Sequence, residues 1–132
     1  MMSDKKKGAD LVADFLEGHG IAHVFGIIGA GNAHIFDAIN RKGYTQIVCV
    51  HHEQAACMAI QTYYRLTGRP GVAILTTGAG STNGLTGVVS AWMDSLPAII
   101  ISGNEIPASR GQTTRCASGV CRVTTVLKSY AS

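Results

Sequence analysis

The chain has 132 residues, of which 46% are hydrophobic and only 14% are charged, and its formal net charge is +3. This length suits one domain with a hydrophobic core and is too short for two ordinary domains. The longest apolar runs are strand-sized, too short for a transmembrane helix, and no basic helix with interleaved aromatic residues follows the lysines at 5–7, so we expect neither a membrane span nor nucleic-acid binding.

Residues 1–7 are expected to form a flexible basic tail. Because Asp4 and the lysines lead directly into an amphipathic segment, we expect no signal peptide. The four cysteines lack the paired spacing of a zinc site or a redox motif, which favours reduced thiols and a cytoplasmic protein. The small share of charged residues also suggests that another domain or subunit covers part of the surface.

Along the chain, the first predicted helix covers residues 8–17, and its 3.6-residue period gives it one apolar face. That face is expected to hold Leu11, Val12, Phe15 and Leu16. A strand is predicted over 21–28 and a glycine-bearing turn over 29–32. Asn32 closes this turn and is expected to cap a helix over 33–41. The buried stripe of that helix is Ile35, Phe36 and Ile39.

A second strand is predicted over 46–50 and a third helix over 53–66. Cys49 lies in this strand and Cys57 on this helix, and we expect both to be small buried hydrophobic residues. A third strand follows over 72–76 and a glycine-bearing loop over 78–83.

The next predicted elements are a fourth helix over 84–93 and, after Pro97, a fourth strand over 98–102. Trp92 and Met93 on this helix are expected to be core or interface residues. Short apolar strands that alternate with helices predict an α/β fold, a doubly wound and mainly parallel sheet with helices on both faces. From residue 103 to 132 the pattern fades into a loop-rich segment with one further short element over 120–130.

The most informative single residue is Glu53, which stands between the second strand and the third helix. Ligands of open α/β sheets bind outside the carboxyl ends of the strands, where a carboxyl group can be held for proton chemistry. A simpler alternative is that an acidic side chain in a first helical turn favours the helix dipole. Position alone favours that alternative.

Two glycine-bearing loops and a histidine pair give weaker signals. Neither the loop at 29–31 nor the loop at 78–80 has the spacing of a dinucleotide fingerprint or a P-loop, so each can equally be a tight turn. His51 and His52 are adjacent, and adjacent residues of a strand point to opposite faces. We therefore predict no metal site, and at most one of these histidines facing a ligand.

Four separate segments, in order and at matching spacing, resemble the amino-terminal pyrimidine-binding domain of thiamine-diphosphate enzymes. The resemblance is to the acetolactate synthase and 2-oxo-acid decarboxylase group, and it covers residues 7–103. The segments are His52-Glu53-Gln54-Ala55-Ala56, then Tyr64-Arg65 with Thr67-Gly68, then Gly78-Ala79-Gly80-Ser81-Thr82-Asn83, then Ala91-Trp92-Met93-Asp94-Ser95-Leu96-Pro97.

This resemblance implies a catalytic role for Glu53 and thiamine diphosphate as the cofactor. In the family, the corresponding carboxyl group hydrogen-bonds N1′ of the aminopyrimidine and so favours removal of the proton from C2 of the thiazolium ring. Ile27, Ile28, Ala79 and Asn83 match positions that line the pyrimidine side of the pocket. Ile28 and Ala79 stand where many relatives have proline, and residues 112–116 lack the Phe-Gln pair of acetolactate synthases.

The family binds the diphosphate and its Mg²⁺ through a Gly-Asp-Gly motif in a second domain, and this sequence contains no such motif. The chain also ends before the last helix and strand of the family's domain. The resemblance therefore implies a subunit or fragment of a 2-oxo-acid lyase or transferase. We expect it to work with a diphosphate-binding partner, as a homo-oligomer, or both. The alternative is a non-catalytic binding or regulatory protein that keeps the fold.

Overall fold

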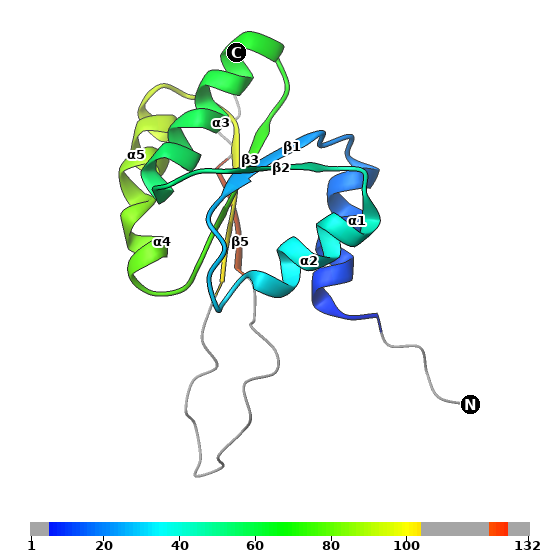
Figure 1. Cartoon of the computed structure of the whole chain (residues 1–132). Helices are drawn as coiled ribbons and strands as arrows, with labels where there is room; N and C mark the ends of the chain where they lie inside the picture. The colour runs from blue at the N-terminus through cyan, green and yellow to red at the C-terminus, as the bar shows by residue number, and fades with distance from the viewer. Residues whose placement is uncertain (1–5, 104–121, 127–132) are drawn as a thin grey trace, which may run out of the picture.

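The computed structural model describes residues 6–103 and 122–126, which form one five-stranded sheet with helices on its two faces (Figure 1). The strands are β1 His23–Gly26, β2 Gln46–Cys49, β3 Gly71–Leu75, β4 Ala98–Ser102 and β5 Arg122–Val126. The first four match the predicted strands, although β1 is shorter than the predicted 21–28. The last lies within the short element expected over 120–130.

The strand order is β2-β1-β3-β4-β5, and every pair is parallel except the antiparallel β4–β5 pair. This confirms the mainly parallel sheet. Gly26 at the end of β1 pairs with Cys49 of β2 and Ile74 of β3, and Leu75 pairs with Ser102 of β4. The carboxyl ends of four strands therefore share one edge of the sheet.

Within the described part of the chain, five helices cover the sheet, two on one face and three on the other (Figure 1). One face carries α1 Gly8–Gly18 and α2 Ala33–Lys42. The opposite face carries α3 Glu53–Thr67, α4 Ala79–Asn83 and α5 Leu85–Met93. Helices on both faces are what right-handed crossovers between parallel strands produce, and they confirm the doubly wound fold. None of the described helices is both long and apolar enough to cross a membrane.

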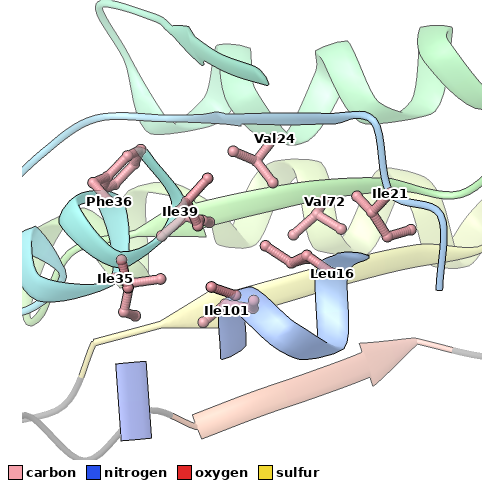
Figure 2. Packing of buried hydrophobic residues seen from close by; sticks show 11 residues of the cluster. Leu16, Ile21, Val24, Ile35, Phe36, Ile39, Val72 and Ile101 are labelled. Atoms are coloured by element: carbon pink, nitrogen blue, oxygen red, sulfur yellow. The ribbon is translucent and has the colours of Figure 1, made fainter. Parts of the chain in front are cut away.

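The larger core lies between the sheet and the α1–α2 layer. Figure 2 shows side chains of both helices meeting apolar residues of three strands. They are Leu16, Ile35, Phe36 and Ile39 from the helices and Val24, Val72 and Ile101 from the strands, all 3% exposed or less. The predicted stripe of α2 is thus confirmed.

The predicted apolar face of α1 is only partly right. Leu16 is buried, but Leu11 is 55% and Phe15 is 40% exposed, whereas Ala13 is buried instead. The helix packs against α2 as well as the sheet, which rotates its buried side towards Ala13. At its start, Lys6 forms an ion pair with Asp14, and residues 1–5 of the predicted tail lie outside the described residues.

A second core lies under α3 and α5. It contains Ala56, Cys57 and Ile60 of α3 together with Ala73, Leu75, Ala91, Ala98 and Ile100. Cys57 is fully buried, as predicted, and burial raises the pKa of its thiol to about 11. Cys49, however, is exposed, because β2 is the outermost strand of the sheet rather than an interior one.

Close approach of α3 and α5 depends on Gly87 and Gln61. A Cβ atom at Gly87 would collide with the Cβ atom of Cys57, so only glycine fits there. Gln61, 7% exposed, donates from Nε2 to the carbonyls of Cys57 at 3.1 Å and Gly87 at 3.0 Å, and its Oε1 accepts from Ser90 at 3.1 Å. These contacts hold α3 against α5, the helix that directly follows α4.

On the outer side of α5, Trp92 is 53% and Met93 is 74% exposed. The interpretation of these two residues as core residues is therefore wrong. Leu85 and Val89 of the same helix are 55% and 54% exposed. The helix thus presents an apolar outer face, which runs from Leu85 near the carboxyl edge of the sheet to Met93 near the amino edge and which we call the α5 face.

Candidate functional site

The candidate site lies at the carboxyl edge of the sheet, where the segments that follow β1, β2 and β3 meet. Glu53 is the first residue of α3, four residues after the end of β2. Asn83 is the last residue of α4, which begins shortly after β3. Since β1 lies between β2 and β3, the two side chains reach each other across the end of β1.

Glu53 and Asn83 are in direct contact although 30 positions separate them in the sequence. The Asn83 amide donates from Nδ2 to Oε2 of Glu53 at 2.7 Å, and both residues are half-buried. The structure thus brings together the predicted catalytic residue and one of the predicted cofactor-binding residues. A charge-assisted hydrogen bond of this kind is short and directional, and it orients the carboxylate.

The charge state of Glu53 follows from the same contact. The hydrogen bond from Asn83, followed by the bond from its own backbone N–H and by nearby His52, lowers the pKa of Glu53 below its ordinary value of 4.5. Partial burial raises the pKa of Glu53, but this effect is smaller than that of the hydrogen bond from Asn83. Glu53 is therefore an anion at neutral pH and can accept a hydrogen bond or a proton.

Residues 79–83, predicted to be part of a loop, form the short helix α4 instead. Gly78 precedes it with φ 61° and ψ −122°, a conformation that residues with a side chain rarely adopt, and this sharp turn lets a helix start immediately. Within α4, a Cβ atom at Gly80 would lie 2.5 Å from Thr76 Cγ2 and 3.0 Å from Glu53 Oε1. Glycine at 80 therefore lets α4 pack closely against Thr76 and the Glu53 carboxylate, where any side chain would clash.

Asn32 does not cap α2 with its side chain, contrary to the prediction. It is fully buried, and its Oδ1 accepts from the Gly29 N–H at 2.7 Å while its Nδ2 donates to the Ile27 carbonyl at 2.9 Å. The backbone N–H of Ala33 bonds to the Gly29 carbonyl instead. The Asn32 side chain is thus free of the helix end and braces the loop that follows β1.

The remaining predicted cofactor-binding residues lie on the segments around this edge. Ile27 and Ile28 follow β1, and Ala79 begins α4. Ile28 is 57% exposed, Ala79 is exposed and Ile27 is half-buried. Ile28 and Ala79, which are expected to stand where many relatives have proline, thus both face solvent in this chain.

The loops at this edge also hold one another in ways that the sequence did not reveal. Ser81 donates to the Thr76 carbonyl at 2.5 Å and shares a hydrogen bond with Ser102 at the end of β4. A Cβ atom at Gly103 would lie 2.7 Å from the carbonyl oxygen of Gly31. Serine, threonine and glycine are common in loops, so their presence in one sequence does not predict which loops contact one another.

Both histidines before Glu53 are exposed, and one of them contacts the site. The ring nitrogens of His52 lie 3.3 Å and 3.4 Å from Asn83 Nδ2. Within 6–103 and 122–126, no group of three His, Cys, Asp or Glu side chains is arranged to hold a metal ion. Residues 112–116, where a substrate-handling pair was sought, lie outside the described residues.

Comparison with known proteins gives a family match over most of the chain. The model of the family described as "Thiamine pyrophosphate enzyme, N-terminal TPP binding domain" matches residues 6–122. The acetolactate synthase of Bacillus subtilis is 43% identical over 110 residues, which are 83% of this chain and 19% of that protein. The large subunit of acetolactate synthase isozyme 3 of Escherichia coli is 41% identical over 96 residues, 73% of this chain and 17% of that protein.

The mitochondrial acetolactate synthase of Schizosaccharomyces pombe is 37% identical over 106 residues, 80% of this chain and 16% of that protein. The chain thus spans only 16% to 19% of the length of these three relatives. Since the family model covers most of the chain, and the four motifs keep their order on the expected fold, the chain belongs to the thiamine pyrophosphate enzyme family and carries its N-terminal TPP binding domain.

Proposed function

We propose that this chain is the pyrimidine-binding part of a thiamine-diphosphate-dependent lyase or transferase that acts on a 2-oxo acid. Glu53 is its catalytic residue, and Ile27, Ile28, Ala79 and Asn83 surround the pyrimidine. The observation that carries the proposal is the 2.7 Å hydrogen bond between Asn83 and Glu53, which aims an ionised carboxylate at the carboxyl edge of the sheet. A glutamate that served only the helix dipole would not need an oriented partner from another helix.

The chemistry asked of this chain is modest and specific. When bound, thiamine diphosphate supplies a nucleophilic thiazolium carbon and a ring that accepts the electrons released from the substrate. Glu53 would hold a proton at N1′ of the aminopyrimidine. Because its carboxylate is held in place before the ligand arrives, little reorganisation is needed at the moment of proton transfer.

The residues present fit a flat aromatic group beside Glu53. Any side chain at 80 would enter the space next to Oε1, since a Cβ atom there already lies 3.0 Å from that oxygen. Exposed apolar groups at Ile28 and Ala79 are available to pack against a ring. A carboxylate with one oxygen left for the ligand and apolar neighbours suit the uncharged pyrimidine, and none of these residues carries the positive charge that would hold a diphosphate.

The diphosphate and its Mg²⁺ are therefore assigned to a partner domain, and we propose that this domain covers the α5 face. Two observations support this occupant. The curated relatives are far longer than this chain, and the α5 face continues directly from the candidate site, where Gln54 Nε2 donates to Thr86 Oγ1 at 3.3 Å.

We also propose a cytoplasmic location. The two cysteines that the structure describes, Cys49 and Cys57, carry free thiols, which suits a reducing compartment.

A chimeric enzyme tests the function. Residues 6–122 replace the matched segment of the Bacillus subtilis relative, and thiamine-diphosphate-dependent release of CO₂ is measured over a panel of 2-oxo acids. We expect activity in the chimera, and a loss of roughly 100-fold or more with Glu53→Gln. Glu17→Gln, at an exposed position of α1, is the control and should keep full activity. Equal activity with Glu53→Gln would refute the catalytic role, and a folded but inactive chimera would favour the non-catalytic alternative.

The same chimera tests the α5 face. Leu85→Lys places a charge on that face near the candidate site, whereas Leu66→Lys changes an exposed residue at the far end of α3. We expect Leu85→Lys to lower activity and weaken assembly in sedimentation experiments while Leu66→Lys changes neither. Equal behaviour of the two variants would show that the partner docks elsewhere.

A further inference from the structure

We propose that Asn83 is a positioning residue that grips Glu53 by its Oε2 atom and so dedicates Oε1 to the ligand. The proposal rests on the proposed function for the identity of the ligand, but the grip itself belongs to the unliganded chain. Nothing in the family motif distinguishes this role from simple packing against the pyrimidine. The two carboxylate oxygens of Glu53 are chemically equivalent, so only their surroundings can make them differ.

Asn83 is suited to this role because its backbone is fixed. It ends α4, and the next residue, Gly84, is buried so tightly that a Cβ atom there would collide with Leu75. The N–H of Gly84 also bonds to the Gly80 carbonyl at 3.3 Å. In the middle of the same helix, the Ser81 hydroxyl donates a hydrogen bond to the Thr76 carbonyl. A short side chain on such a backbone can direct its amide group with little freedom.

The orientation of the Asn83 amide is determined by Glu53. The ionised carboxylate can only accept, so the amide must present Nδ2 to Oε2. The same nitrogen lies 3.3 Å and 3.4 Å from the two ring nitrogens of His52.

One hydrogen of the amide nitrogen is directed at Oε2 of Glu53, and His52 is the second neighbour of that nitrogen. A flipped amide would place an oxygen against a carboxylate, and that contact would be repulsive. Because Asn83 engages Oε2, the other oxygen, Oε1, which lies beside Gly80, is the one that meets the ligand.

The test is a ¹³C NMR titration of the Glu53 carboxyl group in the chain itself, without cofactor or partner. The sequence contains only three glutamates, Glu17, Glu53 and Glu105, so selective labelling gives three signals, and Glu53→Gln assigns one of them. In the wild-type chain, the hydrogen bond from Asn83 keeps the pKa of Glu53 below its ordinary value.

Two substitutions at position 83 should raise the midpoint pH of the Glu53 titration by different amounts. Asn83→Leu removes the hydrogen-bond donor and should raise it. Asn83→Asp adds a second negative charge and should raise it further. Asn40→Asp makes the same amide-to-acid change on an exposed position of α2, towards the opposite edge of the sheet, and should leave the Glu53 midpoint unchanged. Identical midpoints in the wild type and Asn83→Leu would overturn the proposal.

A second measurement needs no substitution and decides the matter even if the variants unfold. In ¹⁵N spectra of the wild-type chain, the two side-chain amide protons of Asn83 should shift with the same midpoint as the Glu53 carboxyl signal. Amide signals that do not respond to that titration would refute the grip. Because neither measurement involves cofactor, this failure is distinct from inactivity of the chimera, which would refute the proposed function.

Discussion

Gln61 offers the sharpest test of how the fold holds the two halves of the candidate site at a fixed separation. Glu53 begins α3 and Asn83 immediately precedes the junction to α5, so their distance depends on how those helices pack. Gln61 is the buried polar link between the helices: of its three hydrogen bonds of 3.0 to 3.1 Å, one lies within α3 and two join α3 to α5. The perturbation we choose is Gln61→Leu, which keeps most of the volume and removes all three bonds.

The expected cost follows from what each bond partner loses. The carbonyls of Cys57 and Gly87 keep their intrahelical hydrogen bonds and Ser90 is half-buried, so no group is left buried without a partner. Three net hydrogen bonds are then worth about 3 kcal/mol in total. The added burial of apolar carbon in leucine returns about 1 kcal/mol. We expect a net loss of about 2 kcal/mol in the free energy of unfolding, or roughly 10 °C in Tm.

Denaturant unfolding followed by circular dichroism measures this loss, with Gln54→Leu as the matched control. Gln54 also lies on α3 and also donates from Nε2 to α5, but its single bond, at 3.3 Å to Thr86, is exposed to solvent. The control should cost less than about 0.5 kcal/mol. If Gln61→Leu were as stable as the wild type, the buried bonds would contribute no net stability and the reasoning would fail.

Three further predictions concern the site and its surroundings. The pKa of Glu53 is lowered in the folded chain, so its contribution to stability is complete above the unfolded value of 4.5 and is lost as pH falls through the lower folded value; Glu53→Gln should flatten the stability profile measured from about pH 6 to about pH 3. Gly80→Ala should cost about 1–3 kcal/mol in unfolding experiments, because the methyl group meets Thr76, and should also lower the activity of the chimera, whereas Gly18→Ala, with open space around it, should do neither. Near neutral pH, iodoacetamide should label Cys49 and leave Cys57 unmodified in peptide mass spectra, because burial raises the pKa of the Cys57 thiol to about 11; rapid labelling of Cys57 would contradict its burial.

The sequence was a reliable guide wherever local pattern and burial coincide. The fourth strand was predicted at 98–102 and lies there, because a proline precedes an apolar run that is buried between two neighbouring strands. The stripe of α2 was also right, since one face of that helix meets the sheet. Glu53 was singled out because it follows a strand, but only the family resemblance favoured a catalytic role, which stays a prediction. Its contact with Asn83 joins residues of two separate motifs.

Other features depend on relations that one sequence does not contain. Nothing local tells which strand is outermost, so Cys49 was wrongly expected to be buried. A helical period shows that α1 has an apolar face, but it does not show which side of the helix packs against α2. Phe15 was therefore wrongly expected to be buried. Asn32 has the right residue type for a cap, and only the path of the loop before it shows that its amide is needed elsewhere.

The strand order β2-β1-β3 has a consequence for how this site could be moved or rebuilt. Glu53 and Asn83 follow strands that do not pair with each other, so the width of β1 sets the gap that their hydrogen bond closes. What matters is thus lateral adjacency, not the route of the chain. A circular permutant that keeps the three strands side by side would retain the pair under new connectivity. If both motifs were moved onto a sheet in which β2 and β3 are direct neighbours, Glu53 and Asn83 would lie too close together for the same hydrogen bond.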